Sequence, residues 1–163
     1  MKNKYIGRTF IAPDQKVRED KVKIKLNVIA SAVKGKRVVL VDDSIVRGTT
    51  SRPIVRGLRE AGAREVHFLS SAPKFLNPCY YGTDIDSREN LIACHHSEEE
   101  IAKIIGADSV GYLDIEKASL IAGGNGGFCM ACFDGKYPTK IPAKIEKNRF
   151  ERPISENPKF QNK

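Results

Sequence analysis

The sequence predicts an α/β fold in which helices flank a parallel sheet. Three observations carry this prediction. A continuous apolar run at residues 38–41 (Val-Val-Leu-Val) is typical of a strand buried on both faces of a parallel sheet. An apolar stripe at helical spacing follows, and a second strand-like run lies at residues 66–70. Together they form one βαβ unit, whose crossover should be right-handed.

The helix of this unit has its own start and stop signals. Ser51 is predicted to cap it, and Pro53 lies in the first turn, where the missing N–H costs nothing. Gly62 supplies the stop. The apolar stripe consists of Ile54, Val55, Leu58 and Ala61.

The rest of the chain is less regular. Residues 72–82 read as a loop with two prolines, and residues 97–100 (Ser-Glu-Glu-Glu) as a capping box that opens a helix through Ile105, ended by Gly106. A short strand is predicted at residues 109–113 and a helix at 116–122, before Gly123. Alternation at residues 22–28 favours a strand, while residues 16–21 could be helical, and this region stays open. The tail from Lys136 is predicted to be a surface wrap or disordered.

The composition is that of one ordinary globular domain. The chain has 163 residues, of which 40% are hydrophobic and 29% charged. No apolar run is long enough for a membrane span, and the first residues lack the apolar stretch of a signal peptide. Four cysteines at uneven spacing do not indicate a secreted disulfide scaffold. We therefore expect a cytoplasmic protein.

The net charge of +8 is concentrated in an N-terminal arm. Residues 1–37 carry eleven basic and three acidic side chains, 11 − 3 = +8, and the remaining 17 basic and 17 acidic side chains cancel. The arm could bind nucleic acid, be a solvated surface element, or close over a polyphosphate ligand. It has only two aromatics, Tyr5 and Phe10, and no nucleic-acid-binding motif, which weighs against the first. The loop after the first strand favours the third.

That loop begins with two carboxylates and ends at a helix N-terminus. Ligands of open α/β sheets bind beyond the carboxyl ends of the strands, where this loop is expected. Adjacent carboxylates can accept hydrogen bonds from a vicinal diol or hold hydrated Mg²⁺. The backbone N–H groups, hydroxyls and helix dipole that follow favour a phosphate, so the loop suits a ribose 5-phosphate. Its residues are Asp42, Asp43, Ser44, Ile45, Val46, Arg47, Gly48, Thr49, Thr50 and Ser51; the Walker spacing and its lysine are absent.

Residues 39–51 (V-L-V-D-D-S-I-V-R-G-T-T-S) resemble the signature of type I phosphoribosyltransferases. In this form the loop is similar to that of the glutamine phosphoribosylpyrophosphate amidotransferase family. Three further segments match that family: L-R-E-A-G-A at 58–63, C-Y-Y-G at 79–82 and C-F-D-G-K-Y-P at 132–138. Residues 5–11 (Y-I-G-R-T-F-I), with Pro13, Gln15, Arg18, Val22, Lys25 and Leu26, are similar to its flexible catalytic loop.

The resemblance implies a type I phosphoribosyltransferase fold and an amidophosphoribosyltransferase reaction. Ammonia released from glutamine would attack the anomeric carbon of phosphoribosyl diphosphate, giving 5-phosphoribosylamine in the first step of de novo purine synthesis. Asp42 and Asp43 would hold the ribose hydroxyls and bear on Mg²⁺, and Ser44 through Ser51 would hold the 5-phosphate. No catalytic residue is certain. Candidates in the flexible region 1–27, which could close over a polyanion, are Lys2, Lys4, Tyr5 and Arg8.

The cysteines leave several chemistries open. Cys129 and Cys132 form a C-x-x-C pair, which could bind zinc together with Cys79, Cys94 or a histidine. An iron–sulfur cluster, a redox pair or unliganded thiols are the alternatives. The resemblance implies a [4Fe-4S] cluster on Cys79, Cys129 and Cys132, with a fourth ligand outside this chain. Cys94 matches no ligand position, and His95 and His96 are expected to have surface or loop roles.

The chain departs from the family pattern at its start. The family's amidotransferase half begins with a nucleophilic cysteine, whereas Met1 is followed by Lys2 here. The first strands of the phosphoribosyltransferase domain are expected before residue 1. We therefore expect a C-terminal part of a longer enzyme, without glutaminase activity, incomplete for synthesis alone, and with exposed sheet edges. Its expected parts are a partial phosphoribosyltransferase domain at 1–122 and a cluster-binding, cysteine-containing extension with tail at 123–163.

The implied partners are small molecules and copies of the chain. The resemblance implies binding of phosphoribosyl diphosphate and purine nucleotides, and a homo-oligomer for the full-length enzyme, with no nucleic acid or membrane partner. Two other functions remain as alternatives. The first is a catalytically incomplete module that senses the ligand. The second is a zinc-ribbon-like nucleic-acid protein, which would not account for the loop at residues 42–51.

Overall fold

The computed structural model describes residues 28–85, 87–121, 123 and 127–141. The flexible-loop candidates Lys2, Lys4, Tyr5 and Arg8, and most of the predicted C-terminal tail, lie outside these residues. The open question of a strand at residues 22–28 likewise concerns a segment almost entirely outside the described part.

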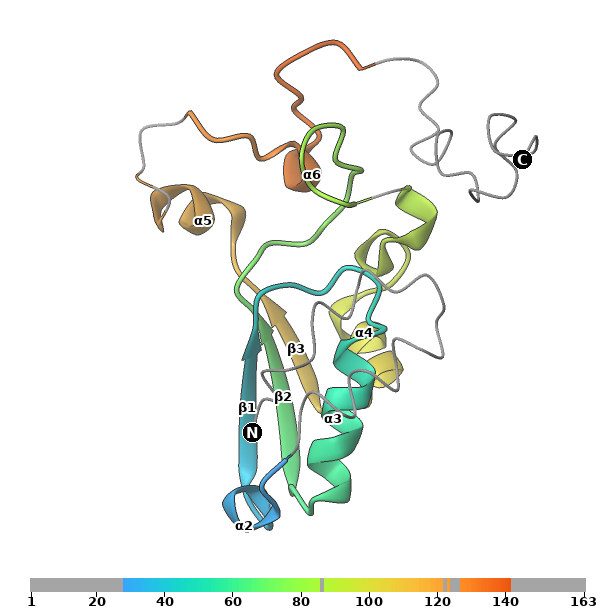
Figure 1. The fold of residues 1–163 in the computed structure, drawn as a ribbon, viewed down its shortest axis with the longest axis vertical. Helices are drawn as coiled ribbons and strands as arrows, with labels where there is room; N and C mark the ends of the chain where they lie inside the picture. Colours follow the sequence, from blue (N-terminus) through green and yellow to red (C-terminus); the bar gives the residue numbers. More distant parts are fainter. Residues whose placement is uncertain (1–27, 86, 122, 124–126, 142–163) are drawn as a thin grey trace, which may run out of the picture.

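Within the described residues, three parallel strands form one sheet in the order β1-β2-β3. They are β1 (Arg37–Asp42), β2 (Glu65–Ser70) and β3 (Ser109–Tyr112) (Figure 1). Leu40 of β1 is in register with Phe68 of β2, which in turn faces Val110 of β3. The predicted α/β class with a parallel sheet is confirmed.

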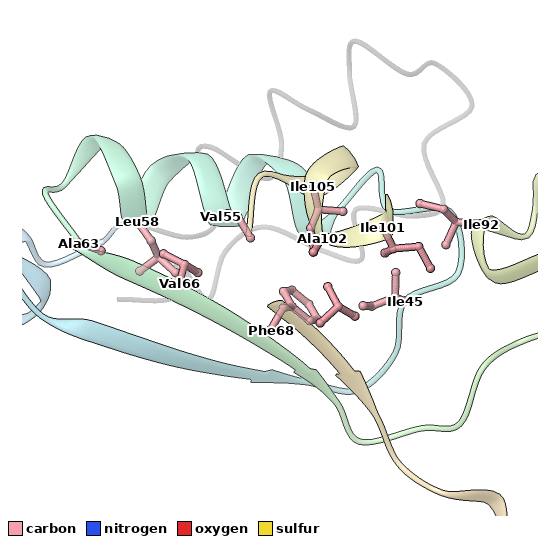
Figure 2. Packing of buried hydrophobic residues seen from close by; sticks show 11 residues of the cluster. Ile45, Val55, Leu58, Ala63, Val66, Phe68, Ile92, Ile101, Ala102 and Ile105 are labelled. Carbon is pink, nitrogen blue, oxygen red and sulfur yellow. The ribbon is translucent and has the colours of Figure 1, made fainter. Parts of the chain in front are cut away.

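Two helices, α3 (Ser51–Glu60) and α4 (Glu98–Ile105), cover one face of this sheet (Figure 1). Val55 of α3 and Phe68 of β2 are both completely buried in the layer between the helices and the sheet. Figure 2 shows α3 running above β2, with the side chains of both directed into the layer between helix and sheet. The main core consists of Ile45, Val55, Leu58, Ala63, Val66, Phe68, Ile92, Ile101, Ala102, Ile105 and Val110.

The opposite face of the sheet is open. Val39 and Val41 are 59% and 64% exposed, and Leu69 of β2 is 42% exposed. The prediction that the first strand is buried on both faces is therefore wrong for the structure described. Side chains alternate between the two faces of a strand, so Val39 and Val41 lie on the face opposite to that of Val38 and Leu40. Strand β1 also lies at the edge of the described sheet. Among the described elements, only the helix-covered face finds packing partners.

The predicted helix ends are largely confirmed. Ser97 caps α4 through a complete capping box with Glu100, and Gly106 ends it in the left-handed conformation. The predicted capping role of Ser51 is wrong. Ser51 is the first helical residue of α3, and the preceding Thr50 already has helical backbone angles and makes no side-chain capping hydrogen bond. Ser51 is instead buried, at 2% exposed.

Shorter elements complete the described part. They are α2 (Ala30–Val33), the 3-10 helices η2 (Arg88–Asn90) and η3 (Ile92–Cys94), α5 (Ile115–Ile121) and α6 (Ala131–Asp134). The predicted helix before Gly123 corresponds to α5, and the short helices α2 and α6 were not predicted. No helix in the described part of the chain is both long and apolar enough to span a membrane.

A second, smaller cluster of buried side chains lies beyond the carboxyl ends of the strands. It is built on Phe75, Ile85 and Leu91. Helix α6 joins it through Phe133, whose ring centroid is 4.8 Å from that of Phe75. The carbonyl oxygen of Cys132 accepts hydrogen bonds from the backbone N–H groups of Leu76 and Asn77 at 2.9 and 3.0 Å. The residues around Cys132 are thus tied to the loop after β2. We call this group, with the cysteines packed against it, the cysteine-side cluster.

Candidate functional site

The loop predicted as the ligand site connects the end of β1 to the start of α3. Strand β1 ends at Asp42, and α3 begins at Ser51, so the loop lies at the carboxyl end of the sheet (Figure 1). This is the position where open parallel sheets bind ligands. All of the predicted residues, Asp42 through Ser51, are among those described.

The two aspartates have different surroundings. Asp42 is half-buried, and its Oδ1 atom accepts a hydrogen bond of 3.0 Å from the backbone N–H of Asp43. Burial raises the pKa of the Asp42 carboxyl above its ordinary value, the Asp43 N–H opposes this, and the Asp43 charge adds to it. Asp43 is exposed, and its Oδ1 accepts a hydrogen bond from the Ser44 hydroxyl at 3.0 Å. The carboxylate of Asp43 is therefore more accessible to a cation or a diol than that of Asp42.

A residue outside the predicted set holds the start of the loop. Ser71, just after β2, donates from its backbone N–H to the carbonyl oxygen of Asp42 at 2.8 Å. Its hydroxyl donates to the same oxygen at 3.0 Å and lies 3.4 Å from the Asp43 carbonyl oxygen. Ser71 thus fixes the backbone of both aspartates. Only its place after the second strand, at the same end of the sheet, could have indicated this from the sequence.

The middle of the loop is anchored in the core. Ile45 is 1% exposed and belongs to the main core, and Figure 2 shows it directed toward Ile101 and Ile92. Gly48 has a φ of +74°, a backbone conformation that favours glycine. A Cβ atom at Gly48 would lie 3.1 Å from Cδ1 of Ile92 and 3.4 Å from Cγ2 of Ile105. The glycine therefore lets the loop backbone lie directly on the core.

The start of α3 faces this loop. Helix α3 has ten residues and no acidic side chain in its first turn. The N–H of Arg52 donates to the carbonyl oxygen of Gly48 at 3.1 Å, which joins the helix to the glycine turn. Because Thr50 does not cap the helix with its side chain, the positive end of the helix dipole remains suited to an anion at this loop.

The cysteines predicted to bind an iron–sulfur cluster come from two separate segments. Cys79 lies in the loop after β2, and Cys132 lies in α6. Both belong to the cysteine-side cluster, while Cys129 is exposed. The pKa of the Cys132 thiol is raised to about 11, mainly by burial, with smaller contributions from the charges of Cys79 and Cys129. Cys79 and Cys132 pack against the same buried residues, Phe75, Ile85 and Leu91. In the described residues, however, no three His, Cys, Asp or Glu side chains form a ready metal-binding group.

Cys79 lies among hydrogen-bond donors. Burial would raise the pKa of its thiol, but hydrogen bonds from the backbone of Tyr81, Thr83 and Gly82, together with the Thr83 side chain, lower the pKa overall. The segment is also tied to the residues after α6, because the Tyr137 hydroxyl donates to the carbonyl oxygen of Pro78 at 2.7 Å. A thiolate at Cys79 is thus stabilised by backbone N–H groups.

The remaining candidate ligands lie apart from this arrangement. The Cys94 thiol donates to the carbonyl oxygen of Leu76 at 3.3 Å and is half-buried. His95 and His96 are exposed, as predicted. His95 Nε2 lies 3.2 Å from the carbonyl oxygen of Arg88, and His96 Nδ1 lies 3.8 Å from a carboxylate oxygen of Glu100. Both histidines therefore make local surface contacts.

Known proteins share this loop-bearing segment at high identity. The chain is 52% identical over 147 residues to an amidophosphoribosyltransferase of Archaeoglobus fulgidus, covering 88% of this chain and 32% of that protein. It is 54% identical over 148 residues to an amidophosphoribosyltransferase of Bacillus subtilis, covering 86% of this chain and 31% of that protein. Most of this chain is thus similar, at about 50% identity, to one part of these amidophosphoribosyltransferases. No family model matches it.

A solved structure supports the same family assignment. The glutamine phosphoribosylpyrophosphate amidotransferase of B. subtilis, complexed with ADP and GMP, superposes with a TM-score of 0.73 at 51% identity. The match covers 90% of this chain and 33% of that amidotransferase. The chain thus spans about a third of the length of the amidophosphoribosyltransferases it matches. The predicted family and fold are confirmed, and the described sheet is a partial one.

Proposed function

We propose that the chain binds phosphoribosyl diphosphate as part of an enzyme that forms 5-phosphoribosylamine from this substrate and glutamine-derived ammonia. The observation that carries the proposal is the loop at residues 42–51. It joins two carboxylates to a glycine turn and a helix N-terminus at the carboxyl end of a parallel sheet. The similarity of the chain to amidophosphoribosyltransferases supports the same substrate. The B. subtilis relative complexed with ADP and GMP supports the binding of purine nucleotides.

The roles of the two aspartates follow from their exposure. Asp43, exposed at the end of the sheet, would accept hydrogen bonds from the ribose hydroxyls and contribute an oxygen ligand to Mg²⁺. Asp42 is half-buried and already accepts the Asp43 N–H, so it would hold the shape of the turn as well as bear on the diol. Bound Mg²⁺ would neutralise the leaving pyrophosphate.

The 5-phosphate would lie against the turn that opens α3. The backbone from Ser44 to Ser51 presents N–H groups there, and the helix dipole adds a favourable positive potential. The hydroxyls of Thr49 and Thr50 would bind the phosphate oxygens, and the Ser44 hydroxyl would do so on leaving its hydrogen bond to Asp43. The carboxylates and the helix start lie at opposite ends of one loop, which suits a sugar phosphate that carries a diol and a phosphate.

We propose further that Cys79, Cys129 and Cys132 hold an iron–sulfur cluster, with a fourth ligand from outside this chain. The donor chemistry fits this group, because iron–sulfur clusters are held by thiolates and Cys79 and Cys132 pack against the same buried residues. Hydrogen bonds from backbone N–H groups also favour a thiolate at Cys79. Once bound, the cluster would supply a covalent link between the loop after β2 and the segment around α6. Iron, sulfide and zinc analysis of anaerobically purified protein tests this, and stoichiometric zinc without sulfide would contradict the cluster.

Ligand binding can be tested on the chain itself. Isothermal titration with phosphoribosyl diphosphate and Mg²⁺ should show saturable binding that Asp43→Asn weakens by about tenfold, the loss of one charge-assisted interaction. Asp84→Asn is the matched control, because Asp84 is an exposed aspartate outside the loop. Absence of binding by the unmodified chain, or an equal effect of both substitutions, would refute the assigned site.

A second measurement separates catalysis from ligand sensing. The alternative function is a catalytically incomplete module that senses the ligand. Release of pyrophosphate in the presence of free ammonia would show that the chain completes synthesis. Binding without release would favour the sensing module.

A further inference from the structure

Neighbouring residues of the ligand loop pack into different clusters. Ile45 is 1% exposed and belongs to the main core between the sheet and α3 and α4. Val46, the next residue, packs against the cysteine-side cluster, whose partly buried members include Cys79, Cys94 and Cys132. The loop therefore contacts the core of the sheet with one side chain and the surroundings of the thiols with the next.

The segment at residues 91–94 repeats this division. Leu91 is fully buried in the cysteine-side cluster, whereas Ile92 belongs to the main core. The N–H of Ile92 donates to the carbonyl oxygen of Val46 at 3.0 Å, so this segment and the loop are hydrogen-bonded. Cys94 lies two residues further on, at the end of η3.

Cys94 is in turn held by the loop after β2. Its thiol donates to the carbonyl oxygen of Leu76, and the N–H of Leu76 donates to the carbonyl oxygen of Cys132. A continuous series of packed side chains and hydrogen bonds thus runs from the ligand loop to the thiols. Because packed clusters rearrange as units, ordering the loop should also restrict local opening of the cysteine-side cluster.

We propose that Val46 is a positioning residue that couples the ligand loop to the cysteine-side cluster. Ligand binding at the loop and the accessibility of Cys94 then change together, and the coupling is reciprocal by thermodynamic linkage. This inference rests on the proposed function, because it takes the loop as the ligand site. It goes beyond that function by assigning a role to the side chain of Val46, which packs against the cysteine-side cluster.

The test measures thiol labelling on the full chain. The rate at which a thiol reagent labels each cysteine is followed by mass spectrometry of the peptides, with and without phosphoribosyl diphosphate and Mg²⁺. Saturating ligand should slow labelling of Cys94 by about fivefold or more, the lower end of typical coupling between sites. Cys129 is exposed and lies outside the cysteine-side cluster, so in protein shown by analysis to hold no iron its labelling rate should not change.

Variants then assign the coupling to Val46. Val46→Ala should bring the ligand-dependent slowing of Cys94 close to onefold, because the side chain no longer reaches the cluster. Val39→Ala is the matched control; it makes the same change at a residue that is 59% exposed on the open face, and it should leave the slowing intact. If Val46→Ala does not fold by circular dichroism, Val46→Thr keeps the branched shape and should reduce the slowing partly.

The outcomes separate the inference from the proposed function. Ligand binding seen by titration, with unchanged labelling of Cys94, would overturn the coupling alone. Persistence of the slowing in Val46→Ala would show that the coupling does not pass through this side chain and would also overturn it. Absence of ligand binding would overturn the proposed function together with the inference.

Discussion

Substitution of Gly48 by alanine tests whether the ligand loop depends on close contact between its backbone and the core. Gly48 has a φ of +74°, which an alanine would adopt at a cost of about 1–2 kcal/mol. The new Cβ atom would also lie 3.1 Å from Cδ1 of Ile92, so that the isoleucine or the loop must shift. Overpacking of this kind costs about 1 kcal/mol or more. We expect Gly48→Ala to lower the free energy of unfolding by about 2–3 kcal/mol, from the backbone and packing costs together.

Gly35 provides a matched control for the backbone cost. Its φ is +72°, and a Cβ atom added there would have nothing within 4 Å. Gly35→Ala should therefore cost only the backbone part, about 1–2 kcal/mol. Urea denaturation of both variants gives the difference. Titration with phosphoribosyl diphosphate should show about tenfold weaker binding for Gly48→Ala and no change for Gly35→Ala.

A double variant identifies the contact itself. Ile92→Val removes the Cδ1 atom that the new methyl group would approach. In the Gly48→Ala background, this second change should recover about 1 kcal/mol relative to the sum of the two single changes. Equal destabilisation by Gly48→Ala and Gly35→Ala, or strict additivity with Ile92→Val, would show that the core does not hold the loop in this way.

Three further changes test other parts of the structure. Asp108 accepts a hydrogen bond from the N–H of Val66 at 2.6 Å, which lowers the carboxyl pKa. Because the folded-state pKa is lowered, the Asp108 carboxylate stabilises the fold above the unfolded-state pKa, and this stability is lost as the pH falls through the folded-state pKa. Asp108→Asn should therefore flatten the pH dependence of the urea midpoint below about pH 5. Ser97→Ala should cost about 1 kcal/mol in thermal unfolding by removing the α4 cap, and a cost near zero would contradict the capping box. The Tyr112 hydroxyl is buried without a hydrogen-bond partner in the described structure, so Tyr112→Phe should leave stability unchanged or raise it by about 1 kcal/mol, and a clear loss would reveal a partner.

Local chemistry accounts for the parts that could be predicted from sequence. The strand at 38–41, the helix that ends before Gly62 and the capping box at Ser97 each depend on residues within one turn or one strand. The ligand loop is contiguous, so its carboxylates, glycine and helix start could be recognised together. The mistaken cap at Ser51 shows the limit, because three hydroxyl residues in succession, Thr49 to Ser51, do not indicate which one begins the helix.

The sequence by itself determined the resemblance to amidophosphoribosyltransferases, the α/β class and the residues of the loop. Only the tertiary structure decided which sheet face is covered, so that Val39 and Val41 are exposed despite their apolar character. It also decided that Ile45 and Val46 enter different clusters and that Cys79 and Cys132 pack in the same one. The physical reason is the same in each case. These features depend on contacts between residues far apart in the chain, and periodicity and capping signals report only on near neighbours.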